Sequence, residues 1–502
     1  MINGKSLVAG EWLGSADSFQ NAPAIGSPDT FSKGTPQMID QACQAAEEAF
    51  LTFGYSKASE RAAFLRAVAD EIDALGDAIT EVGVKETGLP EPRLQGERGR
   101  TVGQLRLFAD HIEGGDYLDR RHDVALPNRA PLPRPDIRMM QRPVGPVGIF
   151  GASNFPLAFS SAGGDTAAAL AAGCPVVVKG HPAHPGVSDL ISQAFDAAIK
   201  KTGVHPGVFS QIQDGGIPVG EALVKHPLIR AIGFTGSLKA GRALYDMCAA
   251  RPDPIPFFGE LGSTNPMFVM PAALANRGEA IAQGWAGSLT MGAGQFCTNP
   301  GIAVVVDGPN VAPFVAAASA ALKDVAAQTM LTDGIAAAYR SGCEAVQNAG
   351  SIETLVATEA DGRNAMPHLH ATTADAWMAD SKLQDEVFGP LGIVVKAKDL
   401  AQARELATSL HGQLTCTLHL DDADADDAQT LMPVLERKAG RVLANGFPTG
   451  VEVSEAMVHG GPYPASTNFG ATSVGTLSIR RFLRPVCYQN MPDALLPSEL
   501  KG

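Results

Sequence analysis

The sequence lacks the features of several classes of protein. Its seven cysteines include no C-x-x-C pair and no His/Cys cluster of metal-ligand spacing, so it predicts neither a disulfide framework nor a metal site. A formal net charge of -14 argues against nucleic acid or an anionic membrane as a partner, although a few local cations can still hold an acidic small substrate. The first residues lack the apolar core of a signal peptide, and no window reaches the ~18 uninterrupted apolar residues of a membrane span. We therefore expect a cytoplasmic protein.

The composition is that of a globular protein with more than one domain. The 502 residues amount to about three times the ~150 residues of a typical domain. Hydrophobic residues make up 45% and charged residues 18%, and the 54 glycines and 35 prolines are spread along the chain. The longest apolar stretch, residues 311–327, is broken by Pro313, Ser319, Lys323 and Asp324, and it predicts an Ala-rich amphipathic helix.

Short apolar runs alternate with helical patterns between residues 145 and 262. This rhythm predicts an α/β fold with a parallel sheet covered by helices. Ligands of such sheets bind beyond the carboxyl ends of the strands. Asn154, Lys179, Gly236 and Glu260 each follow a predicted strand, so we expect them to meet in one crevice. The predicted strands are residues 147–150, 175–179, 208–212, 229–234 and 255–258, and the helices are an Ala-rich segment ending at 172, then 187–200, 219–226 and a segment from 239.

Cys297 and Glu260 are the candidate nucleophile and base. Cys297 stands in Gly294-Gln295-Phe296-Cys297-Thr298-Asn299, and Glu260 in Glu260-Leu261-Gly262. A thiol adds to a carbonyl as its thiolate, so we expect surroundings that lower the pKa of Cys297 below the ~8.5 of a free cysteine. Oxidation of the resulting adduct of an aldehyde would leave a thioester on the cysteine. A separate carboxylate can activate the water that hydrolyses this thioester. Taken alone, a single cysteine is more often an inert core residue.

The other residues at the strand ends have two interpretations each. Gly236 and Gly241 start a predicted helix, where they form either a plain tight turn or a close approach for a dinucleotide pyrophosphate. The G-x-G-x-x-G fingerprint is not present in this stretch. Lys179 is either a solvated strand end or a donor to cofactor ribose or phosphate. Asn154 is either a turn former or a donor to an oxyanion hole.

Together these motifs resemble the NAD(P)-dependent aldehyde dehydrogenase superfamily over nearly the whole chain. The resemblance implies that Cys297 is the nucleophile, that Glu260 is the general base, and that Asn154 and the Cys297 amide form the oxyanion hole. It places Phe155, Gln295 and His459 in the substrate pocket, although His459 has the alternative of an ordered turn. The residues that it assigns to the cofactor are Lys179, Pro182, Gly236, Ser237, Gly241, Glu386 and Phe388. The motifs are Gly151-Ala-Ser-Asn154-Phe155-Pro156, Phe234-Thr235-Gly236-Ser237, Glu260-Leu-Gly262, Gly294-Gln295-Phe296-Cys297 and Glu386-Val-Phe388-Gly-Pro390.

Within the superfamily the chain is most similar to the 2-ketoglutarate semialdehyde (2,5-dioxopentanoate) dehydrogenases. The cues include Lys179-Gly-His-Pro182, Glu260-Leu-Gly-Ser-Thr264 and Arg480-Arg-Phe-Leu-Arg484. The resemblance implies oxidation of that semialdehyde to 2-ketoglutarate, with a medium- or long-chain aldehyde as the alternative substrate. Arg481 and Arg484 are the candidate partners of the distal acid group. Pro182 occupies the position where NAD-preferring members commonly have glutamate, so we expect NADP to be preferred over NAD.

The resemblance also implies domain boundaries and a homodimer or homotetramer. It divides the chain into a Rossmann-type cofactor domain (1–122 and 144–260), an α/β catalytic domain (261–476) and an oligomerisation element (123–143 and 477–502). Five prolines between 127 and 143 favour an extended excursion over a helix. Two rival functions stay open: a coenzyme-A-acylating aldehyde dehydrogenase, which has little use for Glu260, and a non-catalytic member of the same fold.

Overall fold

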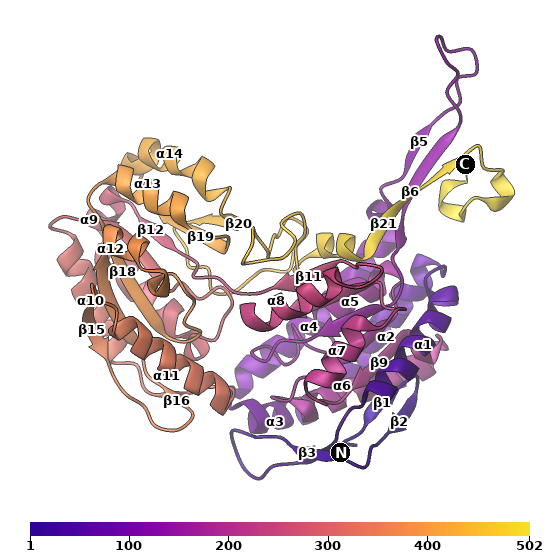
Figure 1. The fold of residues 1–502 in the computed structure, drawn as a ribbon, viewed down its shortest axis with the longest axis horizontal. Helices are drawn as coiled ribbons and strands as arrows, with labels where there is room; N and C mark the ends of the chain where they lie inside the picture. Colours follow the sequence, from indigo (N-terminus) through magenta and orange to yellow (C-terminus); the bar gives the residue numbers. More distant parts are fainter. Residues whose placement is uncertain (502) are drawn as a thin grey trace.

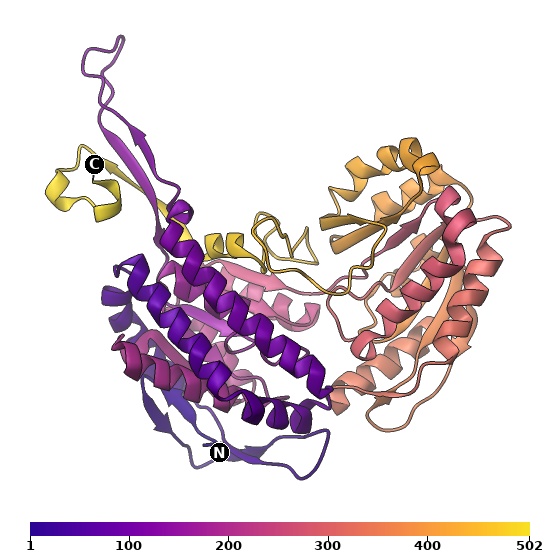
Figure 2. The same ribbon diagram turned by 180° about the vertical axis from the view of Figure 1, so that it is seen from behind.

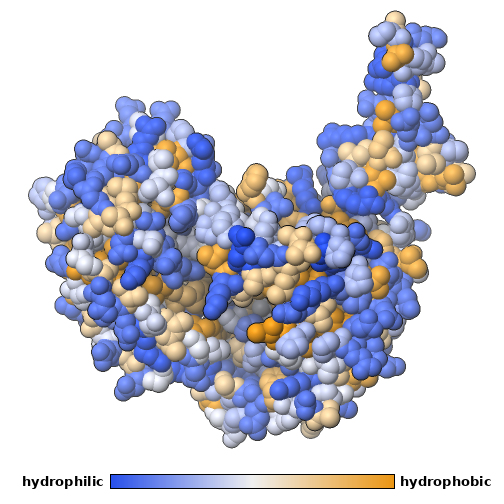
Figure 3. Space-filling view, viewed as in Figure 1, coloured by the Kyte–Doolittle hydropathy of each residue, from blue (hydrophilic) through white to orange (hydrophobic). Residues whose placement is uncertain are grey.

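The computed structural model describes residues 1–501, which form two lobes, each built on a seven-stranded sheet (Figures 1 and 2). The surface between the lobes is hollowed (Figure 3). No helix among residues 1–501 is long and apolar enough to cross a membrane. The first sheet has the order β11-β10-β7-β8-β9-β1-β2, with β1 Ser6–Val8, β2 Glu11–Leu13, β7 Val147–Phe150, β8 Val176–Lys179, β9 Phe209–Ile212, β10 Ala231–Thr235 and β11 Phe257–Glu260.

The core strands of the first sheet are covered by helices on both faces. Alternate side chains of a strand point to opposite faces. Accordingly Ile149 and Val178 pack with helices α2, α4, α5 and α6, whereas Phe150 and Val177 pack with α1 and α7. Burial on both faces explains why these strands read as continuous apolar runs. The helices are α1 Pro36–Phe53, α2 Ala58–Ala74, α3 Gly76–Thr87, α4 Glu91–Gly114, α5 Gly164–Ala172, α6 Pro185–Thr202, α7 Ile217–Lys225 and α8 Leu238–Ala249.

The second sheet follows the same principle in the other lobe. Ile302 and Val304 of β13 pack on one face, and Ala303 and Val305 pack on the other. Its order is β15-β17-β18-β13-β12-β19-β20, with β12 Met267–Val269, β13 Ile302–Val306, β15 Glu353–Ala357, β17 His368–Thr373, β18 Leu391–Ala397, β19 Gln413–His419 and β20 Ala439–Ala444. Its helices are α9 Pro271–Thr290, α10 Val311–Lys323, α11 Asp333–Gln347, α12 Ala374–Ala379, α13 Leu400–Ser409 and α14 Ala425–Leu435.

A long hairpin projects from the first lobe, next to the C-terminal strand (Figure 1). Its strands, β5 (Arg121–Asp123) and β6 (Ile137–Pro143), form a three-stranded sheet with β21 (Leu483–Gln489). Residues 121–133 are exposed, so the expectation of an extended segment that projects from the main body is confirmed. Two small two-stranded sheets complete the list of strands, with β3 Ser18–Gln20, β4 Thr30–Ser32, β14 Gln328–Thr329 and β16 Asn364–Ala365.

The predicted strands and helices between residues 145 and 262 are confirmed, with ends that differ by a few residues. The helix expected after the first strand begins only at Gly164, so residues 151–163 form a loop before it. This loop carries Asn154. The helix expected over 311–327 ends at Lys323.

Candidate active site

Four strand ends place their predicted polar residues along one edge of the first sheet. Asn154, Lys179, Gly236 and Glu260 follow or end β7, β8, β10 and β11, and these strands are parallel neighbours. The chain moves from β7 outwards to β8 and β9, and then returns to the other side of β7 with β10. This reversal of direction is the topological switch point at which open α/β sheets bind ligands.

Cys297 lies in a loop between α9 and β13 that is held tightly from several sides. Gly294 has a positive φ of 66°, and a Cβ at this position would lie 2.3 Å from the carbonyl carbon of Gly389. Glycine is therefore required, and the contact brings the Glu386–Pro390 segment against the cysteine loop. The buried Asn265 side chain donates hydrogen bonds to the carbonyls of Cys297 and Asn299, both at 2.9 Å.

Cys297, His459 and Glu260 form a compact cluster. The Cys297 Sγ lies 3.4 Å from His459 Nε2, and the same nitrogen lies 3.0 Å from Glu260 Oε2. Ser473 Oγ also donates to Glu260 Oε2, at 2.9 Å. One potential metal-ligating atom from each of the three residues lies within 4.8 Å of the other two. A metal ion can also bridge atoms at this spacing. The hydrogen bonds among the groups account for their closeness without a metal.

The thiol and the carboxylate have pKa values shifted in opposite directions. Burial raises the pKa of the Cys297 thiol well above its ordinary value, and the negative charge and hydrogen bond of Glu260 raise it further. Burial also opposes ionisation of Glu260, but His459, Ser473 and Cys297 outweigh it and lower the pKa of this carboxyl. The expected lowering of the thiol pKa is therefore wrong. The thiol is held protonated beside an ionised carboxylate, so it needs a base to become a nucleophile.

Asn154 approaches the nucleophile loop directly. Its side-chain amide donates to the Gln295 carbonyl at 3.0 Å, two residues from Cys297. The loop around Asn154 is fixed by buried Glu97 of α4, whose Oε1 accepts from the amides of Leu157 and Ala158 at 2.8 and 2.9 Å. An amide held in this way is suited to stabilise a developing oxyanion.

The expected pocket residues have different roles in the structure. The Phe155 ring contacts the Phe296 ring edge-on, with centroids 5.3 Å apart, so it lies beside the nucleophile. His459 contacts the thiol, as described above. Gln295 is a correction, because its side chain is engaged by the Leu331 amide at 3.0 Å and the Gly292 carbonyl at 3.1 Å. The buried Gln295 side chain therefore holds the loop that carries Cys297.

The residues expected to bind the cofactor suit a dinucleotide. Residues 236–240 at the N-terminus of α8 are exposed, and Ser237 caps this helix by accepting from the Ala240 amide at 3.4 Å. The positive end of a helix favours phosphate. Gly241 has no room for a side chain, because a Cβ there would lie 2.0 Å from Leu261 Cδ2. These features leave backbone amides accessible to a pyrophosphate group.

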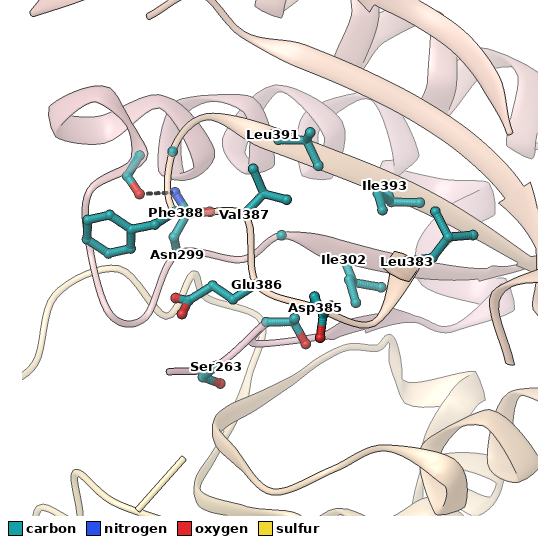
Figure 4. A pocket seen from close by; sticks show the side chains of 14 residues that line it. Ser263, Asn299, Ile302, Leu383, Asp385, Glu386, Val387, Phe388, Leu391 and Ile393 are labelled. Atoms are coloured by element: carbon teal, nitrogen blue, oxygen red, sulfur yellow. Dashed lines mark hydrogen bonds between the residues drawn. The ribbon is translucent and has the colours of Figure 1, made fainter. Parts of the chain in front are cut away.

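Glu386 and Phe388 belong to the second lobe, in the loop that precedes β18. Figure 4 shows Glu386 extending from its loop towards Ser263, with Phe388 farther along the same loop. The Glu386 carboxylate covers Gly262, where a Cβ would lie 2.5 Å from Oε2. A carboxylate in this position can accept hydrogen bonds from ribose hydroxyls.

The sequence reasoning missed an acidic residue at the edge of the first sheet. Lys179 Nζ forms an ion pair with Asp214 Oδ1 at 2.5 Å, and both side chains are largely buried. Asp214 follows β9, the strand next to β8. Pro182 is exposed and brings no charge. A carboxylate just after the next parallel strand was the signal that could have identified Asp214.

The two arginines expected to meet the substrate's acid group differ in their positions, because only Arg481 lines a small cavity with Glu260 and His459. Arg481 is buried and pairs with Asp165 at 2.7 Å, and Arg484 is exposed on β21. Two other arginines, Arg100 and Arg441, are close enough to Cys297 for their charges to interact with the thiolate. Sequence spacing gave no signal for them, because they stand about 200 and 140 residues from Cys297.

A thiol beside an ionised carboxylate, at the ligand-binding edge of a doubly wound sheet, is typical of an α/β enzyme that uses a cysteine nucleophile. Residues 27–475 match the aldehyde dehydrogenase family, and the chain belongs to this family. Its members oxidise aldehydes with NAD or NADP. A relative from Azospirillum brasilense, alpha-ketoglutaric semialdehyde dehydrogenase 2, is 50% identical over 506 residues, which cover 100% of this chain and 96% of the relative. Alpha-ketoglutaric semialdehyde dehydrogenase from Acinetobacter baylyi is 47% identical, with 99% and 96% covered.

Solved structures share the fold at lower identity. Betaine aldehyde dehydrogenase from Staphylococcus aureus, in complex with NAD+, has a TM-score of 0.83 and is 20% identical, covering 98% of this chain and 95% of its own. 1-Pyrroline-5-carboxylate dehydrogenase from Thermus with bound NAD has a TM-score of 0.81 and is 20% identical, covering 97% and 92%. These similarities confirm the expected α/β fold.

Proposed function

We propose that the enzyme oxidises 2-ketoglutarate semialdehyde to 2-ketoglutarate, with NAD(P) as the hydride acceptor. The observation that carries this proposal is full-length similarity, at 50% and 47% identity, to two proteins named for that semialdehyde. The cluster of Cys297, Glu260 and His459 supports a route through a covalent thioester. The ionised carboxylate beside the thiol supports release of a free acid, as opposed to transfer to coenzyme A.

The proposed reaction has two stages, the formation of a thioester on Cys297 and its hydrolysis. Glu260 or His459 takes the proton of Cys297, and the thiolate adds to the aldehyde carbon. The Asn154 amide and the Cys297 backbone amide stabilise the oxyanion. A bound nicotinamide would supply the hydride acceptor, and loss of hydride from the adduct would leave a thioester. The proton taken from the thiol passes to solvent before hydrolysis begins. Glu260 then takes a proton from water, whose oxygen attacks the thioester carbon and displaces the thiolate, releasing the carboxylic acid.

The substrate proposal predicts a clear order among aldehydes. We expect kcat/KM for 2-ketoglutarate semialdehyde to exceed that for hexanal and longer apolar aldehydes by at least about 100-fold. The apolar aldehydes have no carboxylate, so the polar groups that would bind it stay unpaired in the pocket. Initial rates of nicotinamide reduction at 340 nm measure both values. A higher efficiency with hexanal or longer chains would assign the enzyme to the alternative, fatty aldehyde oxidation.

For the cofactor we propose that Lys179, Gly236, Ser237 and Gly241 bind the adenosine half and the pyrophosphate, and that Glu386 and Phe388 bind the nicotinamide half. The preference for NADP stays a prediction from Pro182. The Lys179–Asp214 ion pair opposes it, because Asp214 neutralises the lysine and would repel a 2′-phosphate. A carboxylate here can instead accept hydrogen bonds from the ribose hydroxyls of NAD. We therefore propose that Asp214, more than Pro182, sets the balance between the two cofactors.

Changing Asp214 to asparagine should raise the ratio of kcat/KM for NADP to that for NAD by about 10- to 100-fold, since it removes one repulsive charge and frees Lys179. Asparagine retains Oδ1, which accepts the Gly216 amide at 3.2 Å, so the turn is preserved. Pro182→Glu should lower the ratio, because it adds a carboxylate. Steady-state kinetics with both cofactors give the ratio, and an Asp214→Asn ratio equal to that of the wild type would overturn the role of Asp214.

We also propose the domain boundaries and the assembly. The division into a cofactor domain (1–122 and 144–260) and a catalytic domain (261–476) is supported by the two separate sheets. The projecting hairpin and β21 leave exposed strand edges, and such edges commonly pair with another chain. These exposed edges support the proposal that residues 123–143 and the C-terminal segment form an oligomerisation element. The protein would then be a homodimer or a homotetramer.

A further inference from the structure

We infer that Arg100 and Arg441 together bind the distal carboxylate of the aldehyde substrate. This inference rests on the proposed function and names the groups that would recognise a semialdehyde acid. Arg100 belongs to α4 in the first lobe, and Arg441 belongs to β20 in the second. The two lobes therefore each contribute one cation to the cleft between them.

The two guanidinium groups meet at one short segment of chain. Arg100 Nη1 donates to the carbonyl of Val451. Arg441 donates to the neighbouring carbonyl of Gly450 at 3.0 Å and to that of Pro448 at 2.5 Å. Because residues 448–451 anchor both side chains, the two cations are held in fixed positions near each other.

Both arginines also lie beside the reactive cluster. Arg100 Cζ is 5.6 Å from the centroid of the Phe159 ring, and that ring is 6.0 Å from the ring of His459, the residue that contacts the thiol. Gly440, next to Arg441, packs so closely on Gly460 that a Cβ would lie 2.4 Å from its carbonyl oxygen. Arg100 thus lies one aromatic ring from His459, and Arg441 is close enough to Cys297 for their charges to interact.

Hydrogen-bonding groups on both arginines remain unpaired. Arg100 Nε and Nη2 and Arg441 Nε are buried and have no hydrogen-bond partner among residues 1–501. Glu97 and Glu452 influence Arg100 through their charges, but neither forms an ion pair with it within the described chain. A buried N–H without a partner is costly, so three of them on two arginines anchored to the same segment favour an anionic ligand with several acceptor lone pairs.

Two other arginines nearby differ from Arg100 and Arg441 in having a carboxylate partner, although Arg481 Nη2 is also without a hydrogen-bond partner. Arg93 stacks on Phe155 and Phe296, with Cζ 4.5 and 4.7 Å from their centroids, and its Nε lies 3.8 Å from Glu97 Oε2. Arg481 is paired with Asp165. Arg93 and Arg481 are thus already balanced by carboxylates, whereas Arg100 and Arg441 are not. A five-carbon semialdehyde, which spans about 5 Å when extended, places its carboxylate one residue layer from the reacting carbon.

The test compares Arg100→Gln, Arg441→Gln and the double variant on two aldehydes of equal length, 2-ketoglutarate semialdehyde and pentanal. We expect kcat/KM for the semialdehyde to fall about 10- to 100-fold in each single variant, mainly through KM. With pentanal we expect a change of less than about 3-fold. Arg100→Lys should restore part of the efficiency. Arg106→Gln is the matched control, because Arg106 is on the same helix and is exposed, where ion pairs contribute little.

A second readout is binding of the product dianion. 2-Ketoglutarate should slow alkylation of Cys297 by iodoacetamide in the wild type and lose this protection in the double variant, while thermal unfolding stays unchanged. If the wild type prefers pentanal, the proposed function fails. If the wild type prefers the semialdehyde but the variants lose activity equally on both aldehydes or keep the protection, the proposed function stands and the arginine site is overturned.

Discussion

Replacing Cys297 with alanine is expected to abolish aldehyde oxidation, with kcat falling by at least about 10⁴-fold. The reason is that alanine cannot form the tetrahedral adduct from which hydride leaves, so no part of the covalent route remains. The loop itself should persist, because it is held through the backbone by the Asn265 side chain. Nicotinamide reduction in the presence of a saturating semialdehyde measures the loss.

The matched control for this variant is Cys487→Ala. Cys487 is an exposed thiol on β21, so its removal should leave the rate within about 2-fold of the wild type. Binding of the reduced cofactor, followed by fluorescence, should be similar in both variants and in the wild type. Full activity in Cys297→Ala would refute the thioester mechanism. An inactive variant that no longer binds cofactor would instead indicate misfolding, and Cys297→Ser would then provide the second measurement.

Glu260→Gln is expected to separate acylation from hydrolysis. Glutamine keeps the shape of the side chain but cannot take a proton from water, so the thioester should accumulate after one turnover. A rapid-mixing experiment should show a burst of about one reduced cofactor per site, followed by a steady rate lowered by about 10²- to 10³-fold. If Glu260 also takes the thiol proton, the burst is slower but its amplitude is unchanged.

The dependence on pH gives an independent check of this carboxylate. His459 and Ser473 help to lower the pKa of Glu260 against the effect of burial, so the base stays ionised throughout the neutral range. Its activity should be lost only as the pH falls through this pKa, which is lower than that of an ordinary glutamate. Glu405→Gln, an exposed substitution on α13, should behave like the wild type. Normal turnover by Glu260→Gln without a burst would show that another group hydrolyses the thioester, and release of acid only with coenzyme A would favour the acylating rival.

The sequence by itself determined the five parallel strands of the first sheet and the candidate residues at their carboxyl ends, but not β1 and β2, which join this sheet as antiparallel strands. Runs such as Val147–Phe150 and Val176–Lys179 are buried on both faces, and a buried parallel strand needs apolar side chains throughout. The residue after such a run must lie at the carboxyl edge of the sheet. This local rule was sufficient to group Asn154, Lys179 and Glu260.

Only the tertiary structure decided the electrostatics of the cleft. The pKa of Cys297 rises because burial and the charge of Glu260 act together, and neither effect can be read from the neighbours of Cys297 in sequence. Asp214 meets Lys179 through the pairing of β8 with β9. Arg100 and Arg441 come together from two lobes at residues 448–451. Charges interact through space over several ångströms, so their partners depend on the folded arrangement of distant segments, whereas strand patterns depend on adjacent residues.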